Sequence, residues 1–229
     1  TSNVNRMDSM FNGCSVLTTV PDFNTSNVNR MDFMFYGCSK LKSVPSFDTR
    51  NVTNMHCLFY ECYSLTSVPT FNTSNVTNMG AMFQGCYSLT TIPEMDTSNV
   101  TNFDGIFYSC TSLTTIEGIS FKSFADSTMN YHYLVGWDSI PSLRKAVFKD
   151  IGYQSTAVQF NTENIENWGV NTSEIPDARQ SLVDSLITYS FDRASAGYQT
   201  CEITLSSTTK ALLTSDEIAQ IEAKGFVIA

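Results

Sequence analysis

The chain of 229 residues is 42% hydrophobic and 15% charged, a composition typical of a folded protein with a sizeable core rather than of a disordered one. Its formal net charge is −9, and no basic stripe interrupts the acidic excess, which argues against binding to nucleic acid or to an anionic membrane surface. No apolar run reaches the roughly 18 residues that a membrane-spanning helix needs. We therefore expect no nucleic-acid partner and no transmembrane segment in this chain.

From the N-terminus, a 24-residue unit occurs five times without insertion, with units beginning at Thr1, Thr25, Thr49, Thr73 and Thr97. A fixed period of this size is typical of repeat proteins, in which each unit buries its apolar side against its neighbours. Phenylalanine and leucine each keep one repeat position. We therefore expect two buried columns, one of Phe11, Phe35, Phe59, Phe83 and Phe107 and one of Leu17, Leu41, Leu65, Leu89 and Leu113.

Within a unit, we predict a short helix followed by a short strand. Helical spacing relates four apolar positions of the first unit, Val4, Met7, Met10/Phe11 and Cys14. Residues 1–3 offer side chains that can cap this helix, and Gly13 suits its C-terminal end. The stretch SVLTTVP (15–21) is rich in β-branched residues and predicts a strand that ends at the proline. We interpret the Thr/Ser/Asn run between units as turn and cap chemistry, repeated because the turn repeats.

Five of the seven cysteines occupy one repeat position: Cys14, Cys38, Cys62, Cys86 and Cys110. We interpret them as small buried apolar side chains that fill a repeating slot. Neighbours in such a column would lie about 4.8 Å apart, so adjacent pairs could also just meet the distance limits of a disulfide. The cysteine column therefore does not settle the redox compartment.

The polar turns also allow two functional roles. Asn24, Asp48, Asn72 and Asp96 could bind calcium, but half of these residues are uncharged amides, and turn capping accounts for them more simply. Glycosylation sequons, which the repeat generates automatically, begin at Asn24, Asn51, Asn72, Asn75 and Asn99.

The pattern TSNVTNMxxMFxGCxSLTxxP resembles the BspA-like leucine-rich repeats of bacterial cell-surface proteins, especially the subfamily with a TSNVTNM…MF consensus. The resemblance covers residues 1 to about 119. It implies a right-handed leucine-rich-repeat solenoid of short strands and short helices, secreted or surface-anchored, with a role in adhesion or protein binding. The third and fifth units depart from the pattern at Arg50, Leu58, Glu61, Phe103, Ser109 and Glu117.

The repeat ends near Ile119, and residues 120–229 are expected to form divergent repeats or a helix-rich C-terminal cap, with an independent domain as the alternative. We predict a strand at 129–137, helices at 142–152 and within 173–197, and a strand at 200–206. A capping box formed by Thr214 and Glu217 predicts a helix that closes on Gly225, and FVIA (226–229) predicts a final strand.

The sequence shows no catalytic or metal-binding motif, so we expect no enzyme, no cofactor and no metal. His56 and Cys57 are adjacent, a tempting nucleophile and base, but adjacent residues of the expected helix diverge by about 100° and would not form a dyad. His132 lies alone in an expected strand and is interpreted as structural.

Two repeat positions that flank the turn between helix and strand vary, whereas the core positions hardly change. The first holds Asn12, Tyr36, Tyr60, Gln84 and Tyr108, and the second holds Ser15, Ser39, Tyr63, Tyr87 and Thr111. Tyrosine suits binding surfaces, so Tyr36, Tyr60, Tyr63, Tyr87 and Tyr108 are the candidate ligand-binding residues. The alternative is that these rings only stack along the repeat array and shield its edge.

The favoured function is a non-enzymatic, bacterial cell-surface or secreted protein that binds an extracellular protein or glycan. A structural spacer in a larger surface protein is the alternative, and a fragment of a carbohydrate-active enzyme is a third. The chain starts within the repeat pattern and carries neither signal nor anchor, so we expect a fragment. Its first turn would leave Val4, Met7 and Phe11 uncovered, and we expect mobility or an end-to-end contact there.

Overall fold

A computed structural model describes residues 3–120, 145–149, 159–161, 186–187, 192, 194–195, 201–204, 210–211 and 213–228. The described residues include almost the whole repeat region and separate segments beyond it. The strand predicted at 129–137, with His132, lies outside the described residues, as does most of the helix predicted within 173–197.

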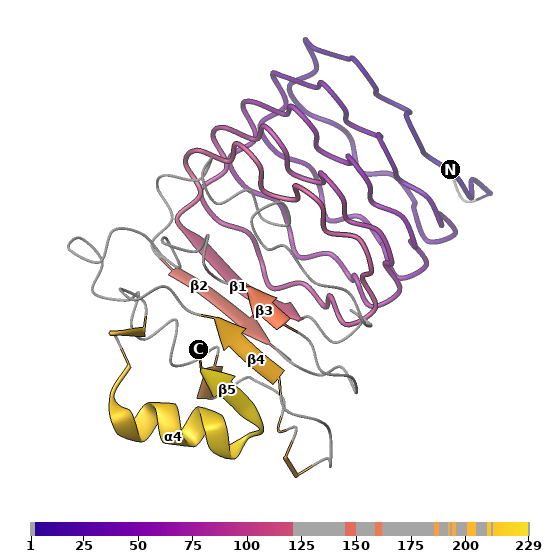
Figure 1. Ribbon diagram of the computed structural model, residues 1–229. Helices are drawn as coiled ribbons and strands as arrows, with labels where there is room; N and C mark the ends of the chain where they lie inside the picture. Colours follow the sequence, from indigo (N-terminus) through magenta and orange to yellow (C-terminus); the bar gives the residue numbers. More distant parts are fainter. Residues whose placement is uncertain are drawn as a thin grey trace.

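The repeats form coils that lie side by side in one stack, each coil being one 24-residue unit (Figure 1). Parallel bridges join equivalent residues of successive coils, namely Arg6, Arg30, Asn54, Asn78 and Asn102. Because the bridged residues are one repeat apart and run in the same direction, each coil repeats the path of the coil before it. Thr91 and Thr115 make a further bridge between the fourth and fifth coils.

The helix that we predicted in each repeat is wrong for the described coils, because the segment folds as a chain of successive turns. In the third coil, Leu58 N–H donates to the Met55 carbonyl at 3.1 Å, and Tyr60 N–H donates to the Cys57 carbonyl at 3.2 Å. The alternate amides point to the next coil instead, where Cys57 N–H meets the Gly80 carbonyl at 2.9 Å. In an α-helix all of these amides would bond within the segment.

Left-handed residues make this alternation feasible. Cys57 and Glu61 have φ values of 52° and 57°, and the other described coils have positive φ at the same two positions. The second of these positions holds glycine in three coils, where the left-handed conformation carries little steric cost. The turn chain places an apolar side chain inward at every third or fourth residue, so its pattern in the sequence is the same as that of a helix.

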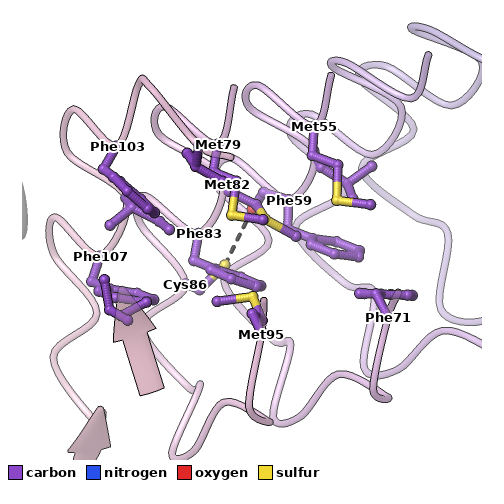
Figure 2. Packing of buried hydrophobic residues seen from close by; sticks show 14 of the residues in the cluster. Met55, Phe59, Phe71, Met79, Met82, Phe83, Cys86, Met95, Phe103 and Phe107 are labelled. Carbon is purple, nitrogen blue, oxygen red and sulfur yellow. Dashed lines mark hydrogen bonds between the residues drawn. The ribbon is translucent and has the colours of Figure 1, made fainter. Parts of the chain in front are cut away.

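The predicted phenylalanine and leucine columns are confirmed from the second coil onward, where their side chains are at most 1% exposed. Phe59 stacks on Phe83 at a ring-centroid distance of 5.8 Å (Figure 2). It also stacks on Phe35 of the preceding coil, at 5.6 Å. In the first coil Phe11 and Leu17 are only partly buried, as expected for the end of the described stack, although Met7 is buried.

The cysteine column consists of free thiols, buried in every coil except the first. Each buried thiol donates to the carbonyl oxygen of a phenylalanine in the preceding coil, as Cys86 Sγ does to Phe59 at 3.1 Å (Figure 2). The equivalent bonds of Cys38, Cys62 and Cys110 measure 3.0–3.1 Å. Burial raises the pKa of Cys38 to about 11 and that of Cys110 to about 12, so both thiols stay protonated at neutral pH. The interpretation of the column as a repeating buried slot is confirmed.

The Thr/Ser/Asn run serves the turns, as predicted. Asn72 Oδ1 accepts from the Ser74 amide at 3.2 Å, and Asp96 Oδ1 accepts from the Ser98 amide at 3.0 Å. The next asparagine of each run joins neighbouring coils, because Asn75 Nδ2 donates to the Arg50 carbonyl at 2.7 Å. The residues that could have bound calcium therefore cap turns.

From the end of the fifth coil onward, all strand pairs in the described residues are parallel. β1 (Thr115–Ser120) pairs with β2 (Lys145–Lys149), and β3 (Gln159–Asn161), β4 (Cys201–Thr204) and β5 (Phe226–Ile228) form a second sheet in that order (Figure 1). The helix predicted at 142–152 is wrong at its centre, since β2 lies there. Pairing with β1 decides the conformation of that segment.

The last three predicted elements are confirmed. The strand within 200–206 is β4, and the strand FVIA is β5. Between them, α4 (Ser215–Ala223) begins with the capping box, in which Thr214 and Glu217 each satisfy an amide of the other. Gly225 follows α4 with a φ of 89°.

Candidate binding surface

The five candidate tyrosines lie on the turns that follow the phenylalanine column, and we call Tyr36, Tyr60, Tyr63, Tyr87 and Tyr108 the tyrosine surface. Four of them form two stacked pairs between neighbouring coils. The ring centroids of Tyr36 and Tyr60 are 4.6 Å apart with 2° between the planes, and those of Tyr63 and Tyr87 are 4.9 Å apart with 8°. The expectation that the rings stack along the repeat array is therefore confirmed for these two pairs.

Stacking leaves much of the tyrosine surface open to solvent. The exposed fraction is 37% for Tyr63, 46% for Tyr87 and 50% for Tyr108. Tyr36 and Tyr60 are half-buried. Large rings that keep such exposure provide contact area for a partner, and their mutual stacking limits the conformational entropy that binding would remove.

Glu61 lies within the tyrosine surface, and sequence reasoning did not select it. It follows Tyr60 directly, is half-buried, and has a φ of 57° at a position where other coils have Gly13, Gly37 and Gly85. A side chain in this left-handed conformation costs free energy that glycine avoids. The signal in the sequence was the departure of the third unit from the repeat, which we noted without assigning it a role.

The electrostatics of the tyrosines link them to Glu61. Burial raises the pKa of Tyr63, and both a hydrogen-bonding interaction with the Glu61 carboxylate and the charge of that carboxylate raise it further. Burial likewise raises the pKa of Tyr60, with the Glu61 charge as the next cause. Both phenols therefore remain neutral at physiological pH and keep their donor and acceptor capacity beside the carboxylate.

The structure brings His56 and Cys57 together, contrary to our expectation. Because the segment is not helical and Cys57 has a φ of 52°, the Cys57 sulfur lies 3.4 Å from His56 Nε2. Burial raises the pKa of Cys57 to about 11, so the thiol is protonated at neutral pH and is not the thiolate that nucleophilic chemistry requires.

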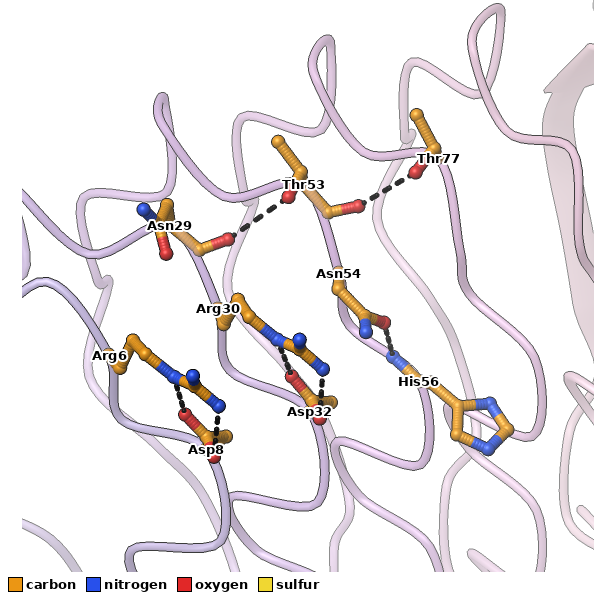
Figure 3. A network of polar contacts seen from close by, with 9 residues as sticks. All are labelled: Arg6, Asp8, Asn29, Arg30, Asp32, Thr53, Asn54, His56 and Thr77. Atoms are coloured by element: carbon orange, nitrogen blue, oxygen red, sulfur yellow. Dashed lines mark hydrogen bonds and ion pairs between the residues drawn. The ribbon is translucent and has the colours of Figure 1, made fainter.

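The polar edge of the stack changes character along the array (Figure 3). In the first two coils, Arg6 pairs with Asp8 and Arg30 with Asp32, each with a shortest distance of 2.8 Å. In the third coil Asn54 replaces the arginine, and its Oδ1 accepts from the His56 amide at 3.0 Å. The sequence from residue 51 to residue 120 contains five acidic residues and no lysine or arginine.

Within the described residues, no group of three or more His, Cys, Asp or Glu side chains could hold a metal ion. In the same residues, every helix is too short or too polar to cross a membrane.

These observations define a repeat protein of stacked 24-residue coils that carries an exposed aromatic surface on its turns. The chain belongs to a family described as "Mycoplasma protein of unknown function, DUF285", which matches residues 1–68 and 42–133 and thus more than half of the chain. This family is related to BspA-like surface proteins, in agreement with the resemblance of the repeat. No curated protein and no solved structure matches the chain.

Proposed function

We propose that this chain is a non-enzymatic binding module of a bacterial cell-surface or secreted protein, and that it holds a protein or glycan ligand at the tyrosine surface. In this proposal the stacked coils are a right-handed leucine-rich-repeat solenoid, and residues 120–229 are divergent repeats that cap it. The relation of the family to BspA-like surface proteins supports the extracellular location.

One observation carries the binding role. The core columns keep the same residue from coil to coil, whereas the tyrosine surface varies and yet presents Tyr63, Tyr87 and Tyr108 with 37–50% exposure. Exposed tyrosine is enriched at protein interfaces because it combines a large contact area with a hydrogen-bonding hydroxyl. A spacer needs no such side chains.

The spacer remains the alternative, since two of the tyrosine pairs also close gaps between coils. The third possibility, a fragment of a carbohydrate-active enzyme, would need a catalytic carboxylate pair. Within the tyrosine surface we identify one carboxylate, that of Glu61, and no carboxylate partner for it. The enzyme fragment therefore has less support than the binding module or the spacer.

The test is a binding screen of the chain against extracellular-matrix proteins and glycans, followed by the double variant Tyr60→Ser/Tyr63→Ser. We expect the double variant to weaken binding by about 1 kcal/mol or more, as for a modest hot spot. Lys40→Ser/Lys42→Ser, which alters exposed side chains of the second coil outside the tyrosine surface, is the matched control. Unchanged affinity in a folded tyrosine variant would remove this surface as the site.

A further inference from the structure

Glu61 departs from the repeat beside Tyr60 and Tyr63 of the tyrosine surface, and its surroundings indicate what the surface binds. We propose that a cation site receives an arginine or lysine side chain from a basic peptide segment of a protein partner, the site consisting of Tyr60, Glu61, Tyr63 and Tyr87. This inference rests on the proposed binding function and specifies the chemistry of the partner.

The Glu61 carboxylate has no cation of its own in the described part of the chain. The three ion pairs found there join Arg6 to Asp8, Arg30 to Asp32 and Arg50 to Asp48. Each is a local pair between residues two positions apart, and none includes Glu61. A half-buried carboxylate is poorly solvated on one side, which favours the approach of a cation from outside.

The charge of this half of the array also favours a cationic partner. The third to fifth coils, residues 49–120, carry five acidic side chains and one arginine, Arg50, so their formal charge is 1 − 5 = −4. The first two coils balance their four acidic residues with Arg6, Arg30, Lys40 and Lys42. A surface with one sign of charge attracts partners of the other sign and speeds their association.

The backbone around Glu61 fixes where its side chain lies. Its φ of 57° is the conformation that Gly37 and Gly85 adopt in the neighbouring coils. Gly85 is also close enough that a Cβ on it would lie 3.4 Å from Glu61 Cγ, so the Glu61 side chain lies against the next coil. Ser109 has a φ of 61° at the same repeat position, so the left-handed backbone belongs to every coil, and in the third coil it holds a charged side chain in place beside the tyrosines.

The arrangement of the rings indicates which ligand group fits. In the Tyr36–Tyr60 and Tyr63–Tyr87 pairs the rings face each other at 4.6 and 4.9 Å, so the facing sides are closed to a sugar ring. The Tyr63 hydroxyl already interacts with the Glu61 carboxylate, and the remaining lone pairs of both groups can accept further hydrogen bonds. A guanidinium offers five donors in a plane and also packs against aromatic rings, and a lysine ammonium offers three donors. The cation site therefore favours a basic peptide over a glycan.

The experiment measures binding of the whole chain to a fluorescent arginine-rich peptide, with the matched lysine peptide and a citrulline peptide of equal length. Citrulline keeps the shape of arginine without its charge. We expect the arginine peptide to bind roughly tenfold or more tightly than the citrulline peptide, the scale of one charge-assisted hydrogen bond. Added salt should weaken binding of the arginine peptide more than binding of the citrulline peptide, because salt screens exposed charges.

Variants of Glu61 separate binding from folding. We expect Glu61→Gly to weaken binding of the arginine peptide by roughly tenfold. The same substitution should raise the melting temperature of the protein, because glycine relieves the strain of the left-handed backbone. Glu61→Gln should lose the affinity without gaining the stability. Asp104→Asn, which removes an exposed acidic group of the same half outside the cation site, is the control and should leave the affinity within about twofold.

Equal binding of the arginine and citrulline peptides would overturn the cation site, as would an effect of Asp104→Asn as large as that of Glu61→Gln. The binding screen separates this failure from failure of the proposed function. If Tyr60→Ser/Tyr63→Ser abolishes binding of a glycan or an uncharged protein segment, the tyrosine surface stands and the cation site is refuted. If neither set of variants changes any binding, both proposals fall.

Discussion

Substitution of Phe59 by alanine tests how the stacked coils are held together. Phe59 is fully buried, and its ring stacks on Phe35 at 5.6 Å and on Phe83 at 5.8 Å, with Phe71 at 6.3 Å. Its backbone amide donates to the Met82 carbonyl at 2.9 Å, so the neighbouring coil is fixed in place and cannot collapse into the space that the ring leaves. We therefore expect the full cost of a cavity, about 3–5 kcal/mol.

Phe11→Ala is the matched control, because it removes the same ring from the same repeat position. Phe11 is partly exposed and stacks on one ring of its column, Phe35, at 5.5 Å. Its loss should cost less than the loss of Phe59, and less than the roughly 1.5–3 kcal/mol that full burial of such a side chain contributes. Urea denaturation followed by far-ultraviolet circular dichroism gives both values. Equal losses in the two variants, or a loss below about 1 kcal/mol for Phe59→Ala, would refute the stacked column as the source of stability.

Three further predictions concern the thiols and the links between coils. In the native protein, a thiol reagent mapped by mass spectrometry should label exposed Cys14 and leave Cys38 and Cys86 unmodified until the protein unfolds. Burial raises the pKa of Cys110 from 9.0 to about 12. The contribution of this buried thiol to the free energy of unfolding is therefore complete below pH 9 and falls by about 1.4 kcal/mol per pH unit above it. Cys110→Ala should accordingly reduce the loss of urea resistance between pH 9 and pH 11 under reducing conditions. Asn75→Ala removes the 2.7 Å hydrogen bond to the Arg50 carbonyl and should lower the free energy of unfolding by about 1 kcal/mol. Asn12→Ala, which changes an exposed turn side chain, is the control, and an equal loss of stability in it would contradict the role of Asn75 as a link between coils.

Repetition made the core predictable from the sequence. A residue that returns every 24 positions meets its own copies in neighbouring coils, so a constant apolar residue indicates a buried column without any knowledge of the path between copies. Phe59 and Leu65 could be placed in buried columns on this basis, and both are fully buried. The helix at 215–223 was predictable for a different reason, since its capping box and final glycine are local signals.

The conformation inside a coil was not predictable in the same way. The spacing of Val52, Met55 and Cys62 fits a helix and a chain of turns equally well, and what distinguishes them is the bonding of alternate amides to the next coil, which is a long-range interaction. The helix error also hid the contact between His56 and Cys57. Glycine at positions 13, 37 and 85 was assigned to helix ends, although a left-handed residue within every coil accounts for it as well.

Glu61 was missed because a departure from a repeat has no meaning until the conformation at that position is known. On a helix it would be one more surface carboxylate, whereas at a φ of 57° it is a residue in a position that glycine occupies in three other coils. The backbone of Tyr36, Tyr60 and Tyr108, by contrast, does not distinguish them, because their amides bond in the same way as those of Asn12 and Gln84 at the same repeat position.

The turn geometry lets this surface change while the core stays constant. At the position of Tyr60, the amide donates back to the residue three before it, at 3.0–3.2 Å in all five coils, whether the side chain is asparagine, tyrosine or glutamine. At the position of Glu61, the amide bonds to the carbonyl of the next coil at 2.7–2.8 Å with either glycine or glutamate in place. Because backbone groups alone make these bonds, substitution of the outward side chains leaves the links between coils intact. A binding surface can therefore arise on the third and fourth coils without altering the columns that stabilise them, provided that the strain at Glu61 is smaller than the stability those columns supply.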